Sequence, residues 1–504
     1  MKRLLCLLMA VVMMLSVAVM ASALTQPFET GTFGCEKFRI PAICTLNDGS
    51  IITVADIRHD HGQDSPGNLD TLSAVSSDLG ETWNYFLVNY LDDCAYGTAN
   101  WNSASYIDSA VIQSKKTGRI FVATTSFTSG GGTFYCERGT GYIEDENGVK
   151  RLALTDLNMR EARNISEYKY YVGEFKDGFA KVVGAEKNYT VDENLYLYLD
   201  GEPLYMTQKN SDKQVPQNLY YEESDFHMFP TCYLSIKYSD DNGKTWSAPR
   251  ILNPELKEEN ENFYGIGPGR GFVTTYNGKE RIIFCAYDNS TGAEATSTFY
   301  SDDNGLTWHR GERIKSAKIL GKSSEAQIIG MPNGDLRIFC RNTSKYVGTA
   351  VSKDGGVSWS RLKADKSLYC TINCLVSFIN TSTYINGKQV VVGSYGCGGD
   401  SRRNGVLRTG LMDKKGNIEW IKRFRLNDGF YAYSCLTELA DGRIACLLED
   451  GPQHITLRYF SIDAKGNIIP EDGVYVDGDL PTKPPFKERL KNFFTELFDF
   501  ASYC

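Results

Sequence analysis

The chain has 504 residues, of which 42% are hydrophobic and 23% are charged, a composition typical of a soluble protein with ample material for a core. Its formal net charge of −8 at pH 7 argues against nucleic acid as the main partner and fits an exported soluble protein. Length alone suggests two or three domains, although single domains built from repeats can reach this size.

The first 23 residues are typical of a secretion signal. Lys2 and Arg3 form a basic start, residues 4–20 are apolar, and Ala21-Ser22-Ala23 supplies the small residues of a cleavage site. An uncleaved anchor is the alternative. No other run approaches the roughly 18 apolar residues of a membrane-spanning helix. The signal predicts a mature protein that is secreted or associated with the cell surface, with no transmembrane segment.

The chain contains 14 cysteines, and one of them, Cys6, lies in the signal. The remaining odd number, spread along a long chain, is not a disulfide framework. Cys285, Cys340 and Cys446 each end an apolar strand-like run, so we expect them to be buried as small hydrophobic residues. One or two disulfides stay open, and the spacing of cysteine and histidine predicts no metal site.

The first polar feature along the mature chain is Phe38-Arg39-Ile40-Pro41, which places an arginine between large apolar residues of a predicted strand. A buried guanidinium is costly unless an anion pairs with it. After the next predicted strand, residues 56–68 form a polar loop rich in turn residues. Taken alone, the tetrapeptide would indicate only a surface arginine. The functional interpretation of both features therefore depends on the repeated motif that follows them.

A motif of the form Ser-x-Asp-x-Gly-x-Thr/Ser-Trp occurs four times and uses four of the six tryptophans. Its copies occupy residues 76–83, 239–246, 301–308 and 352–359. Each follows a strand-like run, so we expect a tight hairpin turn with glycine at a position of positive φ. The side-chain oxygens can bind the turn's own amides, and the tryptophan can anchor the turn. A calcium loop is the rival interpretation, but each motif offers few oxygen ligands.

The spacing of the motifs predicts a repeated unit of one four-stranded sheet. Asp241 and Asp303 are 62 residues apart, and Asp303 and Asp354 are 51 apart, about the length of one propeller blade. Asp78 and Asp241 are 163 apart, which indicates an insertion. Residues 136–228 contain neither tryptophan nor the motif and carry short alternating runs, so we predict a small β-rich domain there.

Together, Phe38-Arg39-Ile40-Pro41 and the four motifs, known as Asp boxes, resemble the bacterial exo-α-sialidases (neuraminidases), the retaining Asp-box enzymes of glycoside hydrolase family 33. The resemblance runs from about Phe38 to about Ile462. It implies an all-β fold, a six-bladed β-propeller whose active site lies on the central axis at the face opposite the Asp boxes. Residues 24–479 without the insertion leave about 60 residues for each of six blades.

The predicted domains are a signal peptide at 1–23, a sialidase propeller at 24–135 and 229–479, an inserted β-rich domain at 136–228 and a helical tail at 480–504. In the tail, apolar residues recur at helical spacing, which predicts a C-terminal amphipathic helix. These residues are Phe486, Leu490, Phe493, Leu497 and Phe500. We expect the helix to dock on the propeller, with membrane or partner binding as the alternative.

The resemblance also implies roles for single residues. It assigns catalysis to Asp64, Glu325 and Tyr433, binding of the substrate carboxylate to Arg39, Arg341 and Arg403, and support of the pocket to Arg58, Asp108 and Glu449. In these roles Asp64 is the general acid and base, and Glu325 assists the nucleophile Tyr433. Three positions have rivals in the sequence: Asp60 for the acid, Arg402 for the third arginine and Tyr431 for the nucleophile, on the assumption that Tyr431 shares a strand face with Tyr433.

These residue types suit a sialoside, whose anomeric carbon carries a carboxylate. Three guanidinium groups bind a carboxylate through charge-assisted bonds that lysine could not match. The fixed negative charge disfavours a carboxylate nucleophile, whereas a neutral tyrosine with a pKa of roughly 10 avoids repulsion and requires a base. Sialidases with a tyrosine nucleophile are a known exception to glycoside hydrolysis by two carboxylates. This mechanism needs no metal and no organic cofactor.

We therefore expect a monomeric enzyme that hydrolyses terminal sialic acid from sialylated glycans, glycoproteins or glycolipids with net retention. A rival function is that of an intramolecular trans-sialidase, which releases 2,7-anhydro-sialic acid. Such relatives place a tryptophan over the pocket from the loop after the nucleophile strand, whereas residues 450–454 here contain none. Two non-enzymatic functions also stay open: a non-catalytic sialoglycan-binding propeller, and an Asp-box propeller of the receptor or structural kind, which lacks the arginine and tyrosine set.

Overall fold

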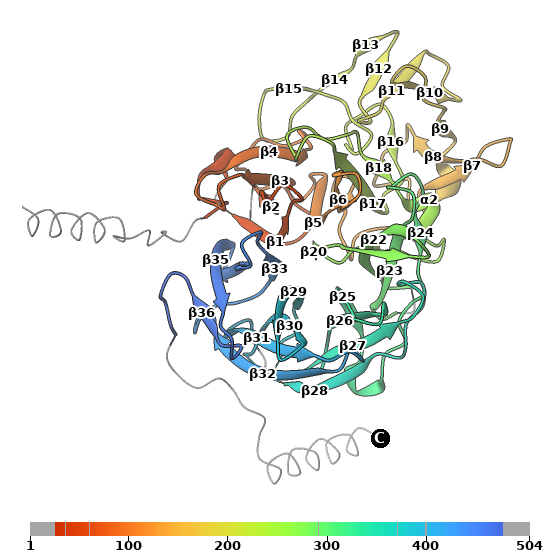
Figure 1. Ribbon diagram of the computed structural model, residues 1–504. Coiled ribbons are helices and arrows are strands. Elements are labelled where there is room, and N and C mark those ends of the chain that lie inside the picture. Colours follow the sequence, from red (N-terminus) through yellow and green to blue (C-terminus); the bar gives the residue numbers. More distant parts are fainter. Residues whose placement is uncertain are drawn as a thin grey trace, which may run out of the picture.

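The computed structural model describes residues 26–476 apart from Glu36, Asp60, Thr291, Cys370, Gly399 and Asp400. The predicted signal peptide, the predicted tail helix and the rival acid Asp60 lie outside the described residues. The described part is almost entirely β-strand, and its sheets stand around a common centre like the blades of a propeller (Figure 1). The prediction of an all-β, propeller-like fold is confirmed.

The ring begins with a nine-stranded sheet made of two antiparallel groups. The first group contains β1 (Phe38–Thr45), β2 (Ile51–Arg58), β3 (Leu69–Ser76) and β4 (Asn84–Asn89). The second contains β5 (Ser105–Gln113), β6 (Ile120–Phe127), β17 (Cys232–Ser239) and β18 (Arg250–Ile251), and β20 (Gly269–Arg270) pairs with β5. The two groups meet at one parallel pair, Leu69 with Ser105.

Four further sheets complete the ring. The first contains β19 (Tyr264–Ile266), β21 (Phe272–Tyr276), β22 (Lys279–Asp288), β23 (Ala295–Ser301) and β24 (His309–Arg310). The second contains β25 (Ser323–Gly330), β26 (Leu336–Asn342), β27 (Tyr346–Ser352) and β28 (Lys363–Tyr369). The third contains β29 (Ser377–Ile385), β30 (Lys388–Gly396), β31 (Gly405–Met412) and β32 (Ile418–Arg425). The last contains β33 (Ser434–Glu438), β34 (Ile444–Gly451), β35 (His454–Ile462) and β36 (Ile468–Pro470).

The chain between β6 and β17 forms sheets of its own outside the ring (Figure 1). One has eight strands: β7 (Tyr142–Glu144), β8 (Lys150–Thr155), β9 (Tyr170–Val172), β10 (Phe179–Val183), β11 (Tyr189–Asp192), β12 (Leu197–Leu199), β13 (Glu202–Pro203) and β16 (His227–Met228). The other pairs β14 (Tyr205–Thr207) with β15 (Gln214–Pro216). Helical structure is limited in the described residues to α2 (Asn253–Leu256) and the short 3-10 turns η1 (Thr32–Gly34), η2 (Ile165–Glu167) and η3 (Lys318–Leu320).

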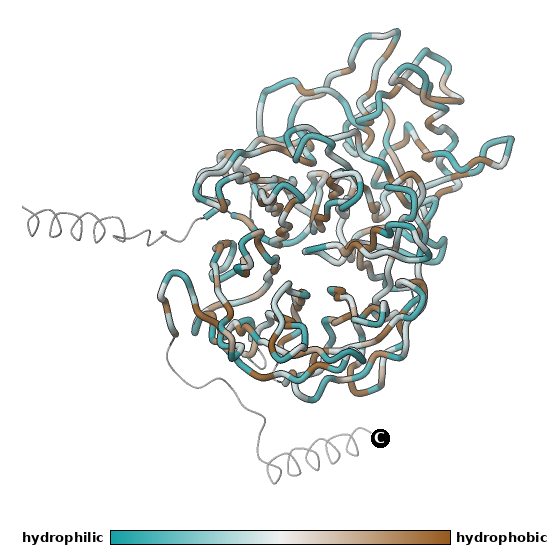
Figure 2. Tube along the Cα trace, viewed as in Figure 1, coloured by the Kyte–Doolittle hydropathy of each residue, from teal (hydrophilic) through white to brown (hydrophobic). Residues whose placement is uncertain are grey.

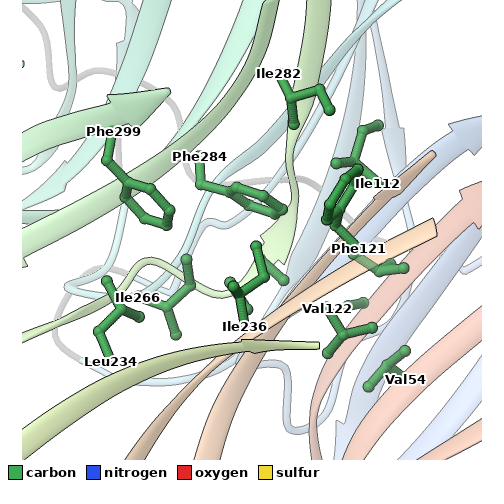
Figure 3. Packing of buried hydrophobic residues seen from close by; sticks show 14 of the residues in the cluster. Val54, Ile112, Phe121, Val122, Leu234, Ile236, Ile266, Ile282, Phe284 and Phe299 are labelled. Carbon is green, nitrogen blue, oxygen red and sulfur yellow. The ribbon is translucent and has the colours of Figure 1, made fainter. Parts of the chain in front are cut away.

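The core lies between neighbouring sheets. Strands such as β2, all of whose residues are buried, are covered on both faces, which explains their near-continuous apolar runs. Figure 2 shows hydrophobic residues gathered along the strands of the ring, while many peripheral loops are hydrophilic. In Figure 3, Phe121 and Val122 of β6 lie near Phe284 of β22. Each such buried side chain contributes roughly 1.5–3 kcal/mol to folding, so contact between sheets holds the ring together.

The four Asp boxes adopt one geometry. In the first, the Ser76 hydroxyl donates to Asp78 Oδ1 at 2.7 Å, the Thr82 amide donates to the same oxygen at 2.9 Å, and the Thr82 hydroxyl donates to Asp78 Oδ2 at 2.5 Å. Gly80 has a φ of 94°, as the predicted turn requires. Both carboxylate oxygens therefore bind the turn itself, and the tryptophan of the third box, Trp308, is buried against Phe121 of the preceding sheet.

Two further turns repeat this geometry without the full motif. In the turn between β31 and β32, Asp413 Oδ1 accepts from the Asn417 amide at 2.9 Å and Oδ2 accepts from the Asn417 side chain at 3.0 Å. Asp463 and Asn467 do the same between β35 and β36. The motif did not predict either turn because the glycine lies one position later, asparagine replaces Thr/Ser and isoleucine replaces Trp, although the shared Asp-x-x-Gly-Asn spacing was visible.

Eleven cysteines are described, and all of them are buried, as expected for Cys285, Cys340 and Cys446. Within the described ranges, none of the helices is both long enough and apolar enough to cross a membrane. The same ranges contain no group of three or more His, Cys, Asp or Glu side chains arranged to hold a metal ion.

The box hydrogen bonds predict an effect on stability. Asp78→Ala removes three of them and should lower the free energy of unfolding by about 1 kcal/mol at pH 7, measured by urea unfolding. Hydrogen bonds from Ser76 and Thr82 lower the pKa of Asp78 to about 2. This is below the unfolded value of about 3.9, so the contribution is lost as the pH falls from about 4 toward 2, and the difference between wild type and variant should shrink.

The matched control is Asp212→Ala, which removes an exposed aspartate for which the described structure shows no side-chain partner. It should leave the urea midpoint nearly unchanged at every pH. An equal loss of stability in both variants would mean that the box hydrogen bonds add nothing measurable.

Candidate active site

The order of the strands places one set of loops at each face of the ring. The Asp boxes follow the ends of β3, β17, β23 and β27. Because neighbouring strands are antiparallel, the starts of β1 and β25 and the ends of β2, β26 and β34 lie at the opposite face. The site residues expected from the sequence lie near these strand ends, so the geometry gathers them opposite the boxes.

Arg39 lies on the bulged start of β1, where the register with β2 shifts between Arg39 and Ala42. Its guanidinium contacts the fully buried Glu449 of β34, with Nε 3.3 Å from Oε1 and Nη2 3.4 Å from Oε2. Glu449 Oε1 also accepts the Ile40 amide at 2.8 Å, although Ile40 has a φ of 59°. Glu449 therefore pairs with the buried charge of Arg39 and also accepts the amide of the strained residue Ile40. This agrees with its expected role of supporting the pocket.

Arg58, at the end of β2, is completely buried. It donates to Asp56 at 2.9 Å, to the Gly62 carbonyl at 3.1 Å and to Asp64 Oδ1 at 2.8 Å. Asp64 also lies 3.4 Å from Arg39, yet 69% of its side chain is exposed to solvent. Burial in the pocket walls raises the pKa of Asp64, but the charges of Arg58 and Arg39 outweigh it and hold that pKa below its usual range.

Asp108 lies on β5 with a φ of 55°, at a bulge between Ile107 and Ser109. Its amide donates to Asp56 Oδ1 at 3.1 Å. Burial, then the charges of Asp56 and Glu325, raise the pKa of Asp108 well above its usual range. Asp108 therefore lies in the same pocket, where burial and the neighbouring carboxylates favour its neutral form over its charged form.

Asp56 is a functional residue that the sequence motifs did not identify. Burial raises its pKa to about 7, although the charge of Arg58 opposes that shift. Asp56 holds both Arg58 and the backbone of Asp108. Its signal in the sequence was Asp56-Ile57-Arg58, two charged residues on one face of an otherwise apolar strand.

Tyr433, Glu325 and Arg341 form the centre of the site. The Tyr433 hydroxyl donates to Glu325 Oε1 at 2.7 Å, and Arg341 Nη1 donates to Glu325 Oε2 at 2.8 Å and to the Tyr433 oxygen at 2.9 Å. Arg341 Nε donates to Asn373 at 2.9 Å. Burial and then the charge of Glu325 raise the pKa of Tyr433 well above 10, while Arg341 lowers it. The tyrosine is therefore neutral and already bonded to a base.

The rival tyrosine is turned away from the pocket. Tyr431 is fully buried, and its hydroxyl lies 2.6 Å from both Ser394 Oγ and Ser434 Oγ. Strand β33 begins only at Ser434, so the expectation that Tyr431 shares a strand face with Tyr433 is wrong. The irregular backbone before the strand separates the two side chains.

The third arginine differs from the expectation by one residue. The Arg402 guanidinium lies 5.5 Å from the centre of the Tyr433 ring, comparable to the 5.6 Å of Arg39. Its charge also acts on Asp64. Arg403 is exposed instead, and its Nε donates to the Ser401 hydroxyl at 2.7 Å. The assignment of Arg403 to the pocket is therefore corrected to Arg402. Arg403 forms an antiparallel β-bridge with Phe430. In such extended backbone the side chains of consecutive residues point in opposite directions, so Arg402 faces the pocket while Arg403 faces away from it.

Two cavities lie near this centre. One, of about 340 Å³, is lined by residues that include Arg402 and Asn373, which accepts from Arg341. The other, of about 320 Å³, is lined by residues that include Phe134, Phe263 and Tyr287. Space of this size near a charged centre can hold a sugar or the group attached to it.

The hairpin between β34 and β35 closes one side of the site. The Gln453 carbonyl accepts from the Phe38 amide at 3.1 Å, which docks the hairpin on β1 beside Arg39. His454 bonds to Asp450 at 2.9 Å. This hairpin carries no tryptophan, so its position beside the site is consistent with the expectation of an open pocket.

Comparison with known proteins agrees with this geometry. Residues 211–446 match the family described as a BNR repeat-like domain. The anhydrosialidase of Macrobdella decora is 31% identical over 82% of this chain and 58% of its own length, and sialidase B of Streptococcus pneumoniae is 27% identical over 82% of this chain and 61% of its own. The chain thus spans about three fifths of the length of these two relatives.

A solved structure extends the likeness to the whole fold. The intramolecular trans-sialidase from Ruminococcus gnavus, in complex with oseltamivir carboxylate, aligns with a TM-score of 0.78 and 29% identity, over 88% of this chain and 98% of that one. This likeness agrees with the propeller-like fold that the sequence motifs of this chain implied. In sequence and in fold, the chain is therefore similar to sialidases and to an intramolecular trans-sialidase.

Proposed function

We propose that this protein is an exo-α-sialidase that hydrolyses terminal sialic acid with net retention, through a covalent sialyl intermediate on Tyr433. The observation that carries the proposal is the Tyr433 hydroxyl, which donates to Glu325 at 2.7 Å while Arg341 donates to it at 2.9 Å. A tyrosine between a base and a cation at the centre of an arginine pocket suits attack on an anionic sugar.

The substrate carboxylate would bind among three guanidinium groups. Arg39 and Arg402 lie about equally far from the Tyr433 ring, and Arg341 touches its hydroxyl. Glu449 and Glu325 neutralise part of this charge and leave other N–H groups free to donate. The anomeric carbon, to which the carboxylate is attached, would then lie next to the tyrosine oxygen.

A neutral nucleophile explains why the pocket uses tyrosine. An ionised carboxylate would be repelled by the substrate's own carboxylate. Tyr433 carries no charge before reaction, because burial and Glu325 raise its pKa. As its oxygen bonds to the anomeric carbon, the proton passes to Glu325, and Arg341 stabilises the charge that develops.

Asp64 would serve as acid and then as base. In the empty pocket, Arg58 and Arg39 keep it ionised. A bound carboxylate would draw on the charge of Arg39 and so raise the pKa of Asp64, which makes proton donation to the leaving oxygen easier. After the leaving group departs, the same carboxylate can take a proton from water that attacks the sialyl-tyrosine bond. Arg58, Asp108 and Asp56 support this side of the pocket.

We propose the following organisation around this site. Counting the two antiparallel groups of the nine-stranded sheet separately gives six blades, and the six Asp-containing turns support that count. Residues 136–228 form an inserted domain at the site face, within a chain divided as the sequence predicts. The protein acts as a secreted or surface-associated monomer on sialylated glycans, glycoproteins or glycolipids, without cofactor.

A second candidate function is intramolecular transfer, in which the sugar's own glycerol arm attacks the intermediate in place of water. The names of two relatives, an anhydrosialidase and an intramolecular trans-sialidase, favour it. The tryptophan-free hairpin at 450–454 favours hydrolysis instead, because nothing there covers the pocket against water. The two functions share every residue described so far and differ only in the acceptor.

The nucleophile can be tested by trapping. A 2,3-difluoro sialic acid should add one fluorosialyl mass to the wild-type protein and to Tyr431→Phe, because the Tyr431 hydroxyl faces two serines in the core. Tyr433→Phe should gain no mass, since it lacks the oxygen that forms the bond. Intact-mass spectrometry measures the result. A labelled Tyr433→Phe beside an unlabelled Tyr431→Phe would reverse the assignment.

The adjacent arginines give a matched pair. Arg402→Ala should lower kcat/KM for a fluorogenic α-sialoside by about 100-fold, because it removes charge-assisted bonds to the carboxylate. Arg403→Ala should stay within about threefold of wild type, because its guanidinium lies outside the pocket. Thermal unfolding checks that both variants fold. Loss of activity in Arg403→Ala alone would show that the sequence register was right.

The product separates the two candidate functions. Proton NMR of the early products from a 2,3-linked sialoside should show the α-anomer of free sialic acid first, followed by mutarotation to β. This outcome follows from two inversions at the anomeric carbon and from water as acceptor. A dominant 2,7-anhydro product would establish intramolecular transfer, and an initial β-anomer would contradict the retaining mechanism.

A further inference from the structure

The connection between β4 and β5 presents an exposed tryptophan. Trp101 has 51% of its surface in solvent. One face of its ring stacks on His61, with ring centres 3.7 Å apart and planes inclined by 16°. A large exposed aromatic side chain held in one orientation is typical of a binding surface rather than of a core.

The backbone around Trp101 is fixed from two directions. The Gly130 amide donates to the Ser103 carbonyl at 3.2 Å. From the segment between β6 and β17, Lys209 Nζ donates to the Asn102 carbonyl at 2.8 Å and pairs with the buried Asp93 at 3.1 Å. The indole is therefore presented by a rigid loop, although its outer face is open.

This loop is joined to the loop of the proposed acid at two points. His61 is three residues before Asp64, so the stacked ring belongs to the acid's own loop. The hydroxyls of Ser65 and Ser105 lie 2.8 Å apart, and Ser105 is four residues after Trp101. Trp101 thus lies beside the mouth at which the Asp64 carboxylate meets solvent.

Position and chemistry together indicate what binds there. The proton of Asp64 must reach the oxygen that links sialic acid to the next sugar, so that sugar has to lie on the solvent side of the carboxylate. A pyranose ring has a face of C–H groups that packs on an aromatic ring, with hydroxyl groups at its edge. We propose that Trp101, backed by His61, is the platform that binds the first sugar of the leaving group.

This inference rests on the proposed sialidase function and adds a specificity-determining residue to it. The contact with the leaving sugar exists before and during cleavage of the bond, so it strengthens capture of glycan substrates up to departure of the leaving group. Substrates without such a sugar gain nothing from it. Trp101 would therefore make the protein prefer sialylated oligosaccharides over simple sialosides.

The test compares two substrates that differ only in the leaving group, 3′-sialyllactose and the methyl α-sialoside, with released sialic acid as the readout. Trp101→Ala should lower kcat/KM for 3′-sialyllactose by about tenfold and leave the methyl sialoside within about twofold of wild type. Trp101→Phe should lose less, because it keeps an aromatic face. Tyr384→Ala removes an aromatic residue of β29 that is 63% exposed, and it should change kcat/KM for neither substrate.

Trp101→Leu keeps an apolar side chain at this position without an aromatic face and serves as the test if the alanine variant fails to fold. An equal loss on both substrates, or no loss on either, would overturn the inference while leaving the sialidase function intact. A selective loss in Phe134→Ala but not at Trp101 would also overturn it, since Phe134 is another exposed aromatic residue, 85% exposed, on the loop after β6. A wild-type protein inactive on both substrates would overturn the proposed function together with the inference.

Discussion

The pocket depends on the neutralisation of buried arginine charge. Arg39 and Arg341 lie within the ring of sheets, where a guanidinium without a partner would cost several kcal/mol. Each has a buried glutamate, Glu449 for Arg39 and Glu325 for Arg341. Glu449 reaches Arg39 from β34, which is 410 residues away in the sequence, so the ion pair closes the ring where its first and last sheets meet. The same ion pair therefore contributes to the site and to the closure of the ring.

The same charges, together with burial, shift the pKa values of three carboxyl groups in different directions. Asp64 contacts two arginines and is held ionised, whereas burial and neighbouring carboxylates raise the pKa of Asp56 and Asp108. The same residue type therefore supplies an ionised acid/base at the mouth of the site and carboxyl groups with raised pKa values on its wall, and only the surroundings differ. Tyr433 follows the same rule, since burial beside Glu325 raises its pKa and keeps it neutral until its proton passes to Glu325.

Sequence reasoning succeeded where a residue's role follows from a local pattern. The Asp boxes and Phe38-Arg39-Ile40-Pro41 were sufficient for the fold class and for most of the residues that the pocket brings together. It failed where the backbone is irregular. Arg402 and Arg403 are adjacent, and only the bridge to Phe430 decides which one faces inward. Strand alternation likewise fails just before β33, and the proximity of Trp101 to the acid loop depends on two connections that no spacing encodes.

The two faces of the ring differ in how their loops are held. At one face, both carboxylate oxygens of each box aspartate accept hydrogen bonds from the turn that contains it, and these bonds hold neighbouring strand ends in register. At the other face the connections are long, and Asp64 and Trp101 remain open to solvent.

The segment between β6 and β17 leaves from this second face and returns without disturbing the ring, since β6 and β17 stay paired from Phe127 with Cys232 to Ile120 with Ser239. Closing so long a loop costs little more than closing a short one. Because Lys209 of that segment donates to the Asn102 carbonyl, in the connection that carries Trp101, the segment also stiffens the rim of the site.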